Sequence, residues 1–432
     1  MNKMTRRSFT LAASGAVLSA ATGLVARPAL AAGAAKIVII GGGPGGATAA
    51  NRLLAGNPQL DITLIEPKET YTTCFYSNLF IGGFRPFASL NHTYDGLKKR
   101  GIKVLTDTAS SIDTTAKTVT IEKAAITLPY DRLIVAPGID FKYDAIEGYS
   151  AEAAEIMPHA WAGGQQTWLL KGKLLAMPDG GNVVMTVPGN PYRCPPGPYE
   201  RACMIAHFLK QHKPKSKLII FDAKKTFSKQ PVFEEAFKTI YKDVVELNLT
   251  NEIDDFAVSK VDAKTGEITS KAGRKEIAAV ANIIPPQKAG AIAAKAGLTE
   301  GDWAPVNPDN FTSMKAKDVY VIGDAAIAAD MPKSAFSANN QAGVVAADIL
   351  ADVAGKTRGP GKYRNTCWSM IGPGNSTKIG GDYVPGKKDG KGFLEVKEPF
   401  VSKAGESADV RKATYDESAA WYDAVTNDIF AK

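Results

Sequence analysis

Short runs of Ile, Val and Leu recur along the chain, each bounded by glycine, proline or polar residues. Continuous apolar runs of this kind are typical of strands buried on both faces of a parallel sheet. The clearest examples are "KIVII", "DITLIE", "YDRLIVAPG", "GNVVMTV", "KLIIFDAKKTF" and "KDVYVIGDAA". Helix-forming segments lie between several of them, so the pattern predicts an α/β fold.

The first run, Lys36–Ile40, leads directly into a glycine-rich turn. Gly41, Gly43 and Gly46 form GxGxxG and a helix-forming run follows, an arrangement that lets backbone N–H groups approach a pyrophosphate. The next strand ends in Glu66, 20 residues beyond Gly46, where an acid accepts hydrogen bonds from an adenosine ribose. A lone motif would fit a structural turn, but the whole arrangement predicts a dinucleotide site, for either NAD or FAD.

Two later strands favour FAD. "YDRLIVAPG" ends in the small-residue turn Pro137-Gly138, and "KDVYVIGDAA" contains Gly323-Asp324 directly after its apolar run. These elements resemble the returning segments of flavoproteins with two dinucleotide-binding domains, in which the acid of the Gly-Asp pair holds the ribityl chain.

That resemblance implies two Rossmann-like domains and a C-terminal cap. The expected division is an export signal at 1–31, an FAD-binding domain at 34–147 and 285–356, a second Rossmann-like domain at 148–284 and a cap at 357–432. After the Gly-Asp pair, Ser337 is predicted to cap a helix running to about Leu350. The N-terminus of this helix would face the flavin and favour its anionic reduced form. Lys333 would either add a fixed positive charge there or be a solvated loop residue.

The inserted domain lacks a second glycine-rich loop. Its first strand is followed by "PGNPYRCPPGP", in which five prolines lack the N–H groups that a phosphate needs. We therefore predict that this chain binds no NAD(P)H. The rigid turn instead presents Cys194, with Glu200 near the start of the next helix. Cys367, in "YRNTCWSM", follows the last FAD-binding element. Two sulfurs converging on a flavin would form a thiol–disulfide relay. A structural disulfide or two unrelated cysteines are the alternatives.

The two other cysteines lie in different surroundings. Cys74, in "YTTCFYSNLFIGG", belongs to a loop expected to run along the flavin. A lone thiol there would be either covalently bonded to the flavin or simply a buried free cysteine. Cys203 lies on the helical run "YERACMIAHFLK" and is predicted to fill core space.

Composition and charge narrow the functional classes. "MTRRSFTLAASGAVLSAATGLVARPALAAG" has a paired arginine, an apolar run and a small-residue cleavage pattern. We predict a twin-arginine export signal and a periplasmic protein; a membrane anchor is the alternative.

Removing residues 1–31 takes away four of the 52 basic residues and leaves 48 against 44 acidic ones. This charge balance is too mild for a nucleic-acid protein. No stable membrane insertion is expected. With four His, four Cys and no CxxCH, neither a metal site nor a haem attached to this chain is expected.

Taken together, the sequence resembles the flavoprotein subunit of flavocytochrome c sulfide dehydrogenases and the related flavoproteins of sulfur oxidation. "GGGPGGATAA", "ITLIEPKETYTTC", "RCPPGPYERA", "FSKQ", "MPKSAFSANNQ" and "NTCWS" carry the resemblance. It implies that Cys74 carries FAD through a thioether, that Cys194 and Cys367 are the redox pair, and that Glu200 is the acid–base residue. It also implies oxidation of sulfide to zero-valent sulfur, with electrons passed to a separate c-type cytochrome subunit that holds the haem.

Two rival functions remain open. A sulfide:quinone oxidoreductase would need a membrane-binding tail, but the C-terminal segment is rich in acids and lacks a strongly basic amphipathic face. A non-catalytic flavoprotein that binds a partner would not need its cysteines. The sequence is expected to depart from the family pattern in "GPGNSTKIGGDYVPGKKDGKGFLEV" and in the extra thiol of Cys203.

Overall fold

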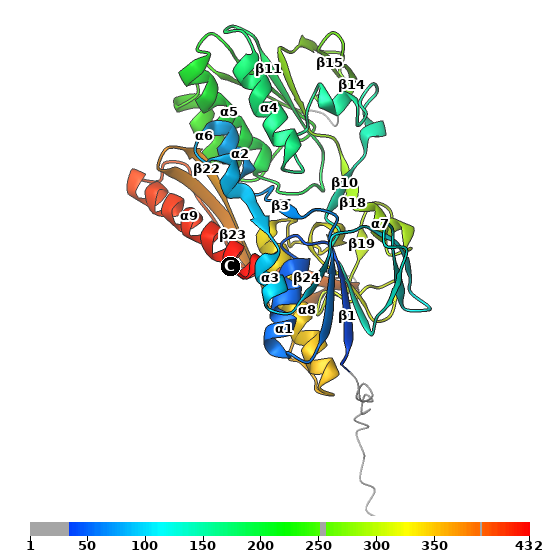
Figure 1. Cartoon of the computed structure of the whole chain (residues 1–432). Helices are drawn as coiled ribbons and strands as arrows, with labels where there is room; N and C mark the ends of the chain where they lie inside the picture. Colours follow the sequence, from blue (N-terminus) through cyan, green and yellow to red (C-terminus); the bar gives the residue numbers. More distant parts are fainter. Residues whose placement is uncertain (1–33, 251–255, 389–390) are drawn as a thin grey trace, which may run out of the picture.

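The computed structural model describes residues 34–250, 256–388 and 391–432. Figure 1 shows two lobes, with the C-terminal strands and helix α9 (Ala408–Phe430) along one flank. The predicted export signal at 1–31 lies outside the described residues. In the part of the chain that is described, no helix is both long enough and apolar enough to cross a membrane.

A five-stranded parallel sheet forms the core of the lower lobe, in the order β20-β9-β1-β2-β5. Its strands are β1 (Lys36–Ile40), β2 (Asp61–Ile65), β5 (Lys103–Leu105), β9 (Arg132–Val135) and β20 (Val319–Val321). β20 comes from the far side of the insert yet pairs in parallel with β9, so two distant segments build this sheet.

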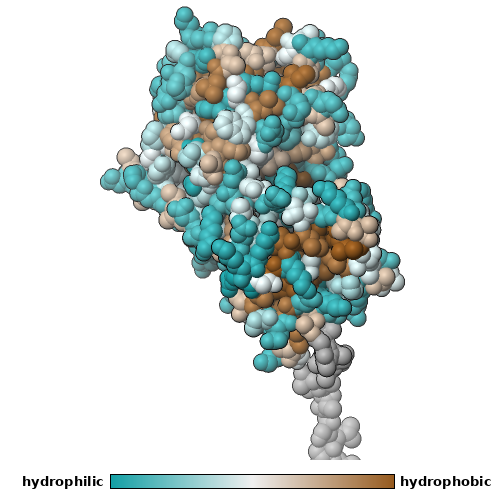
Figure 2. Space-filling model, in the orientation of Figure 1, coloured by the Kyte–Doolittle hydropathy of each residue, from teal (hydrophilic) through white to brown (hydrophobic). Residues whose placement is uncertain are grey.

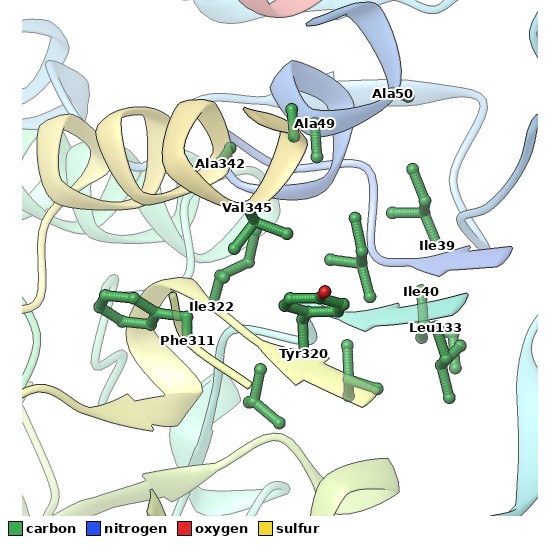
Figure 3. Packing of buried hydrophobic residues seen from close by; sticks show 14 of the residues in the cluster. Ile39, Ile40, Ala49, Ala50, Leu133, Phe311, Tyr320, Ile322, Ala342 and Val345 are labelled. Atoms are coloured by element: carbon green, nitrogen blue, oxygen red, sulfur yellow. The ribbon is translucent and has the colours of Figure 1, made fainter. Parts of the chain in front are cut away.

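Two helices pack against the same region of this sheet. α1 (Gly46–Gly56) and α8 (Ala335–Val353) contact each other through small side chains, with Ala49 of α1 and Ala342 of α8 near the strands (Figure 3). Ile39 of β1 is fully buried below them. Burial under these helices fits the almost continuously apolar sequences of β1 and β9.

The upper lobe has a second parallel sheet, in the order β13-β12-β11-β17. Its strands are β11 (Val183–Val187), β12 (Leu218–Asp222), β13 (Val245–Leu249) and β17 (Val280–Ile283), and its helices are α4 (Gln165–Ala176), α5 (Gly197–His212) and α6 (Gln230–Thr239). All five residues of β11 and of β12 are buried. The predicted α/β fold with Rossmann-like domains is therefore confirmed.

Short antiparallel pairs, three-stranded sheets and small helices complete the two lobes. The chain passes between the lobes at the antiparallel pair β10 (Ile139–Phe141) and β18 (Gln287–Ala289). The remaining elements are β3 (Thr70–Thr72), β4 (Asn91–Thr93), β6 (Ala109–Asp113), β7 (Thr118–Ile121), β8 (Thr127–Pro129), β14 (Val258–Asp262), β15 (Glu267–Ser270), β16 (Lys275–Ile277), β19 (Ala304–Pro305), β21 (Ala326–Ile327), α2 (Ser77–Gly82), α3 (Asp95–Lys99) and α7 (Ala291–Lys295).

The C-terminal layer is an antiparallel sheet followed by one long helix. β22 (Tyr363–Gly372), β23 (Asn375–Lys388) and β24 (Lys391–Val401) pair in that order. β22 contacts both α8 of the lower lobe and α5 of the upper lobe, and α9 contacts β23 and α1. This layer therefore spans the two lobes. Figure 2 shows hydrophilic residues over much of the visible face, with a hydrophobic area on the lower lobe.

Helix α8 begins three residues earlier than expected. Its N-cap is Ser334, whose hydroxyl accepts the N–H of Ser337 at 3.0 Å, and it extends to Val353. The prediction that Ser337 caps this helix is wrong, because Ser337 lies inside its first turn and supplies the N–H that the cap satisfies.

Candidate functional site

A cavity of about 740 Å³ is lined by residues of both lobes and of the C-terminal layer. Of the residues predicted to form the site, those that line it are Gly41, Gly43, Glu66, Cys74, Pro137, Gly138, Cys194, Glu200, Gly323, Asp324 and Cys367. Gly46 and Lys333 do not line it. The cavity thus brings together groups that are far apart in the sequence.

The glycine-rich loop is closed too tightly for any other residue. Gly41 has a φ of +99°, and a Cβ there would lie 2.2 Å from the carbonyl oxygen of Ala136. A Cβ on Gly46 would lie 1.9 Å from the carbonyl oxygen of Gly41, so only glycine lets the start of α1 pack this closely against the loop. Gly46 therefore supports the loop from outside the cavity lining. Glu66 Oε2 accepts the N–H of Gly42 at 2.9 Å, so the acid is fixed beside the loop. This cradle fits the adenosine diphosphate part of FAD.

Asp324 offers an unused acceptor at the cavity. Its Oδ1 is buried and has no hydrogen-bond partner, and its Oδ2 lies 3.7 Å from Arg193 Nη1. Burial raises the pKa of this carboxyl, while the charges of Arg193 and Lys333 lower it. A buried acceptor without a partner is costly unless a ligand completes it. The hydroxyl groups of a ribityl chain would do so, which supports the fit to FAD.

Lys333 is buried behind the residues that line the cavity. Its Nζ donates to the carbonyl oxygens of Asp324 at 3.0 Å and Ala326 at 2.6 Å, and lies 3.7 Å from the ring centroid of Trp303. The residue is buried, so the solvated-loop interpretation is wrong. It does not itself line the cavity, and its fixed positive charge near the flavin stays a prediction. The side chain packs against Trp303, and its positive charge lies next to Asp324 outside the cavity lining. Burial lowers the pKa of Lys333 to about 8.

Cys74 lies on the cavity wall between β3 and α2. Ser77 Oγ donates to the Cys74 carbonyl oxygen at 2.6 Å, which closes the turn that begins α2. Gly163 approaches the Cys74 backbone so closely that a Cβ on it would lie 3.2 Å from Cys74 Cα. Cys74 is half-buried, forms no disulfide and lines the cavity.

Cys194 is held at a fixed point of the proline-rich turn. Its φ is +58°, in the left-handed region that a non-glycine residue rarely adopts. Its N–H donates to the Lys333 carbonyl oxygen and its carbonyl accepts the Gly197 N–H, both at 2.8 Å. A Cβ on Gly197 would lie 2.9 Å from Cys194 Sγ, so glycine leaves room for the sulfur. Backbone strain of this kind is often retained at functional sites.

Cys367 lies on β22 beside a fixed amide. Ser334 Oγ and Ser337 Oγ donate to Asn365 Oδ1 at 2.6 and 3.1 Å, which leaves Asn365 Nδ2 to face Cys367 Sγ at 3.4 Å. The first turn of α8 therefore orients a donor toward this sulfur. Burial raises the pKa of Cys367, and the hydrogen bond from Asn365 lowers it.

All four cysteines are free thiols in this structure. Burial raises the pKa of Cys194 well above its ordinary value, and the charges of Cys367 and Glu200 raise it further. Cys203 is fully buried in the core of the upper lobe, where it does not line the cavity.

Glu200 of α5 is hydrogen-bonded to two other elements. Its Oε1 accepts the N–H of Met370 on β22 at 2.8 Å, and its Oε2 accepts Asn78 Nδ2 of α2 at 2.8 Å. Asn78 Oδ1 in turn accepts Arg201 Nε at 2.9 Å. Burial raises the pKa of Glu200, and the bonds from Met370 and Asn78 lower it. A buried carboxyl with a raised pKa is suited to proton transfer near neutral pH.

Sequence reasoning missed Arg193, Asn78 and Arg201, which all line the cavity. Arg193 directly precedes Cys194 in the proline-rich turn, and its adjacency was the one available signal. Asn78 and Arg201 meet only because α2 packs on α5. No spacing along the chain indicates that contact.

Three family models match successive parts of the chain. The model described as "Pyridine nucleotide-disulphide oxidoreductase" matches residues 35–162. "Sulfide dehydrogenase [flavocytochrome c] flavoprotein chain, central" matches residues 167–285, and "Flavocytochrome c sulphide dehydrogenase, flavin-binding" matches residues 360–430.

A sulfide dehydrogenase [flavocytochrome c] flavoprotein chain from Chlorobaculum thiosulfatiphilum is 44% identical over 46 residues, which are 96% of that sequence and 11% of this chain. The chain belongs to the flavocytochrome c sulfide dehydrogenase flavoprotein family. It is thus a flavin oxidoreductase of a sulfide-oxidising family, with a flavin as its cofactor. The expected departure of the C-terminal segment from the family is wrong, because the flavin-binding model covers 360–430.

More distant relatives share the fold. The mitochondrial sulfide:quinone oxidoreductase of Mus musculus is 22% identical over 312 residues, which are 67% of this chain and 65% of that protein. The structure of the sulfide:quinone oxidoreductase from Aquifex aeolicus has a TM-score of 0.66 at 20% identity, covering 92% of this chain and 93% of that one. A NAD-dependent persulfide reductase from A. fulgidus has a TM-score of 0.65 at 17% identity, covering 88% and 77%.

Proposed function

We propose that this family member oxidises sulfide to zero-valent sulfur with the Cys194–Cys367 pair and FAD, and passes the electrons to a c-type cytochrome subunit. The observation that carries the proposal is the composition of one cavity wall. Both thiols and the buried Glu200 line the same cavity as the glycine-rich loop and Asp324. This reaction needs a pair of sulfurs that a nucleophile can attack, a proton acceptor and a flavin-binding loop.

In the proposed first step, hydrosulfide attacks one sulfur of the oxidised pair. The cysteine S–S bond breaks and a new S–S bond forms, leaving a persulfide on one cysteine and a thiolate on the other. Glu200 accepts the persulfide proton, because its raised pKa makes it a stronger base than an exposed carboxylate. The persulfide sulfur then bonds to the thiolate sulfur, which gives a trisulfide and releases one electron pair.

FAD would be held by the glycine-rich loop, Glu66 and Asp324, with a thioether to Cys74. When bound, FAD takes up the electron pair and the proton, so that hydrosulfide and FAD give one zero-valent sulfur atom and reduced flavin. Arg193 Nη1 lies 3.7 Å from Asp324 Oδ2, and its positive charge lowers the pKa of Cys194, so it opposes the cost of negative charge in a buried site.

The acceptor and the location form a further part of the proposal. The matched family model names a flavoprotein chain of a flavocytochrome, which supports a separate subunit that carries the haem. A flavin can release a two-electron load as single electrons to such a haem. The predicted export signal supports a periplasmic site. We also propose that NAD(P)H is not used, because Pro198 stands in the first turn of α5, where a phosphate-binding loop would supply N–H groups.

A quinone acceptor is the second candidate, and the match to the mouse sulfide:quinone oxidoreductase favours it. Steady-state assays separate the cytochrome acceptor from the quinone acceptor. The flavoprotein is assayed with sulfide and with either cytochrome c or a short-chain quinone. Turnover with the quinone alone would transfer the proposal to that class.

Anaerobic sulfide titration of the holoprotein tests the cysteine chemistry. Sulfide should bleach the flavin of the wild type, whereas Cys194→Ala and Cys367→Ala should each slow bleaching by at least about 100-fold. Cys203→Ala is the matched control, because Cys203 is buried away from the cavity. Equal bleaching in all four proteins would favour the non-catalytic class and defeat the proposal.

A further inference from the structure

Lys229 is the buried lysine of "FSKQ", and the proposed reaction gives it no role. It precedes α6 with a φ of +62°, and its side chain points into the protein with 4% of the residue exposed. Its Nζ donates to the Cys367 carbonyl oxygen at 3.2 Å, Ser369 Oγ at 2.8 Å and the Thr377 carbonyl oxygen at 3.4 Å. The ammonium group is thus fixed against the backbone of one member of the sulfur pair.

The three acceptors of Lys229 are dipoles and carry no formal charge. Burying an ammonium ion is costly unless opposite charge lies near it. The acidic groups that raise the pKa of Lys229 are, in order of effect, Cys367, Glu200 and Cys194. They are the three groups assigned to the sulfide reaction. Burial lowers the pKa of Lys229 to about 8, and Arg411 of α9 lowers it as well.

Opening the sulfur pair changes the charge of this buried region. Hydrosulfide brings one negative charge into the site, and that charge remains on the sulfurs after the disulfide breaks. Arg193 already opposes this charge near Cys194, and Lys229 is a second cation close to the pair. Lys229 lowers the cost of the added negative charge, and its ammonium needs no movement because neutral acceptors already hold it.

We propose that Lys229 is a positioning residue of the redox pair, whose fixed ammonium holds β22 at Cys367 and stabilises the thiolate formed when the pair opens. This inference rests on the proposed function, since it assigns Lys229 to the same sulfurs. Lys229 acts through charge and through the Cys367 backbone, because its Nζ donates to two carbonyl oxygens and one hydroxyl and not to a sulfur atom. It comes from the inserted domain, while Cys367 comes from the C-terminal layer, so this contact also ties the two together.

The test is the pH dependence of thiol alkylation in the fully reduced holoprotein. Iodoacetamide reacts with thiolates, and peptide mass spectrometry reports Cys194 and Cys367 separately. The groups facing Lys229 are Glu200, Cys194, Cys367 and Arg411. Lys229→Gln keeps a hydrogen-bond donor and removes the charge, whereas Lys229→Arg keeps the charge.

A nearby cation lowers a thiol pKa, so its removal should raise it. In Lys229→Gln we expect the midpoint for Cys367 to rise by about one pH unit, which means about tenfold slower alkylation below that midpoint. Lys229→Arg should stay close to wild type. The Cys194–Cys367 couple should become harder to reduce by about tenfold in its equilibrium with glutathione, or about 30 mV for two electrons.

Two controls keep the outcome interpretable. Lys171→Met removes a half-buried lysine of α4 that donates to the Ile81 carbonyl oxygen at 2.8 Å, and it should change neither midpoint. Lys229→Met serves if the glutamine variant folds poorly. Unchanged midpoints and an unchanged couple in a folded neutral variant would overturn the inference. Failure of sulfide to bleach wild-type flavin would instead overturn the proposed function, so the two failures are distinct.

Discussion

Replacing Gly46 by alanine is a sharp test of the dinucleotide cradle. The added Cβ would lie 1.9 Å from the carbonyl oxygen of Gly41 and 3.1 Å from Ile39 Cγ2. Ordinary contact begins near 3.4 Å, so the start of α1 must move away from the loop by roughly 1.5 Å. Forcing a methyl group into a packed contact typically costs about 1–3 kcal/mol.

That displacement withdraws the N-terminus of α1 from the pyrophosphate site. If the whole cost falls on the bound state, FAD affinity should fall by about 5- to 150-fold, because 1.4 kcal/mol is tenfold. The measurement is a fluorescence titration with FAD in a Cys74→Ser background. This background removes the proposed thioether, so that FAD binding is reversible. Thermal unfolding of the apoprotein shows any part of the cost that falls on folding.

Gly172→Ala is the matched control, because Gly172 lies in α4 with no atom within 4 Å of its added Cβ. Alanine in a helix interior should stabilise the protein by up to about 1 kcal/mol and leave FAD affinity unchanged. If Gly46→Ala instead bound FAD as tightly as its parent and unfolded at the same temperature, the packing of the loop against α1 would be refuted.

Three further changes test other parts of the site. After acid denaturation, flavin should stay on the wild-type protein and leave the Cys74→Ser variant; free FAD from both would count against the thioether. Asp324→Ala should lower the FAD content of the purified protein, because it removes the unpartnered acceptor, and Asp324→Asn should retain more. In the wild type, the bleaching rate should rise with pH as Glu200 loses its proton, and its raised pKa places that rise above the ordinary range of Glu. Glu200→Gln should abolish this rise and slow flavin bleaching by at least about tenfold, because glutamine cannot accept the proton. The double variant Glu200→Gln/Asn78→Asp should restore the hydrogen bond between positions 78 and 200 but not the bleaching rate. Recovery of both would clear Glu200 of an acid–base role.

The parallel sheets were predictable because their signal is local. A buried strand such as β1 needs an unbroken apolar run, and the turn after it needs glycine at Gly41 and Gly46 whatever the rest of the chain does. Cys194 and Glu200 were also accessible, since the proline-rich turn and the start of α5 place them within six residues of each other.

The rest of the site depends on contacts between distant segments. Lys229 is 138 residues from Cys367, and Asn78 is 122 from Glu200. Neither pairing follows from spacing, because each requires the insert to dock on another layer. Lys333 could not be placed because its surroundings are set by Trp303. Ser334 and Ser337 are both suitable caps, and only the backbone geometry of the first turn selects Ser334.

The central claim is that sulfide sulfur passes through the cysteine pair. The direct measurement is one anaerobic turnover with limiting sulfide, followed by acid quench, proteolysis and mass spectrometry of the peptides that carry Cys194 and Cys367. We predict that the pair gains one sulfur atom, as a persulfide or trisulfide, in step with flavin reduction. Full flavin reduction without added sulfur on either cysteine would contradict it.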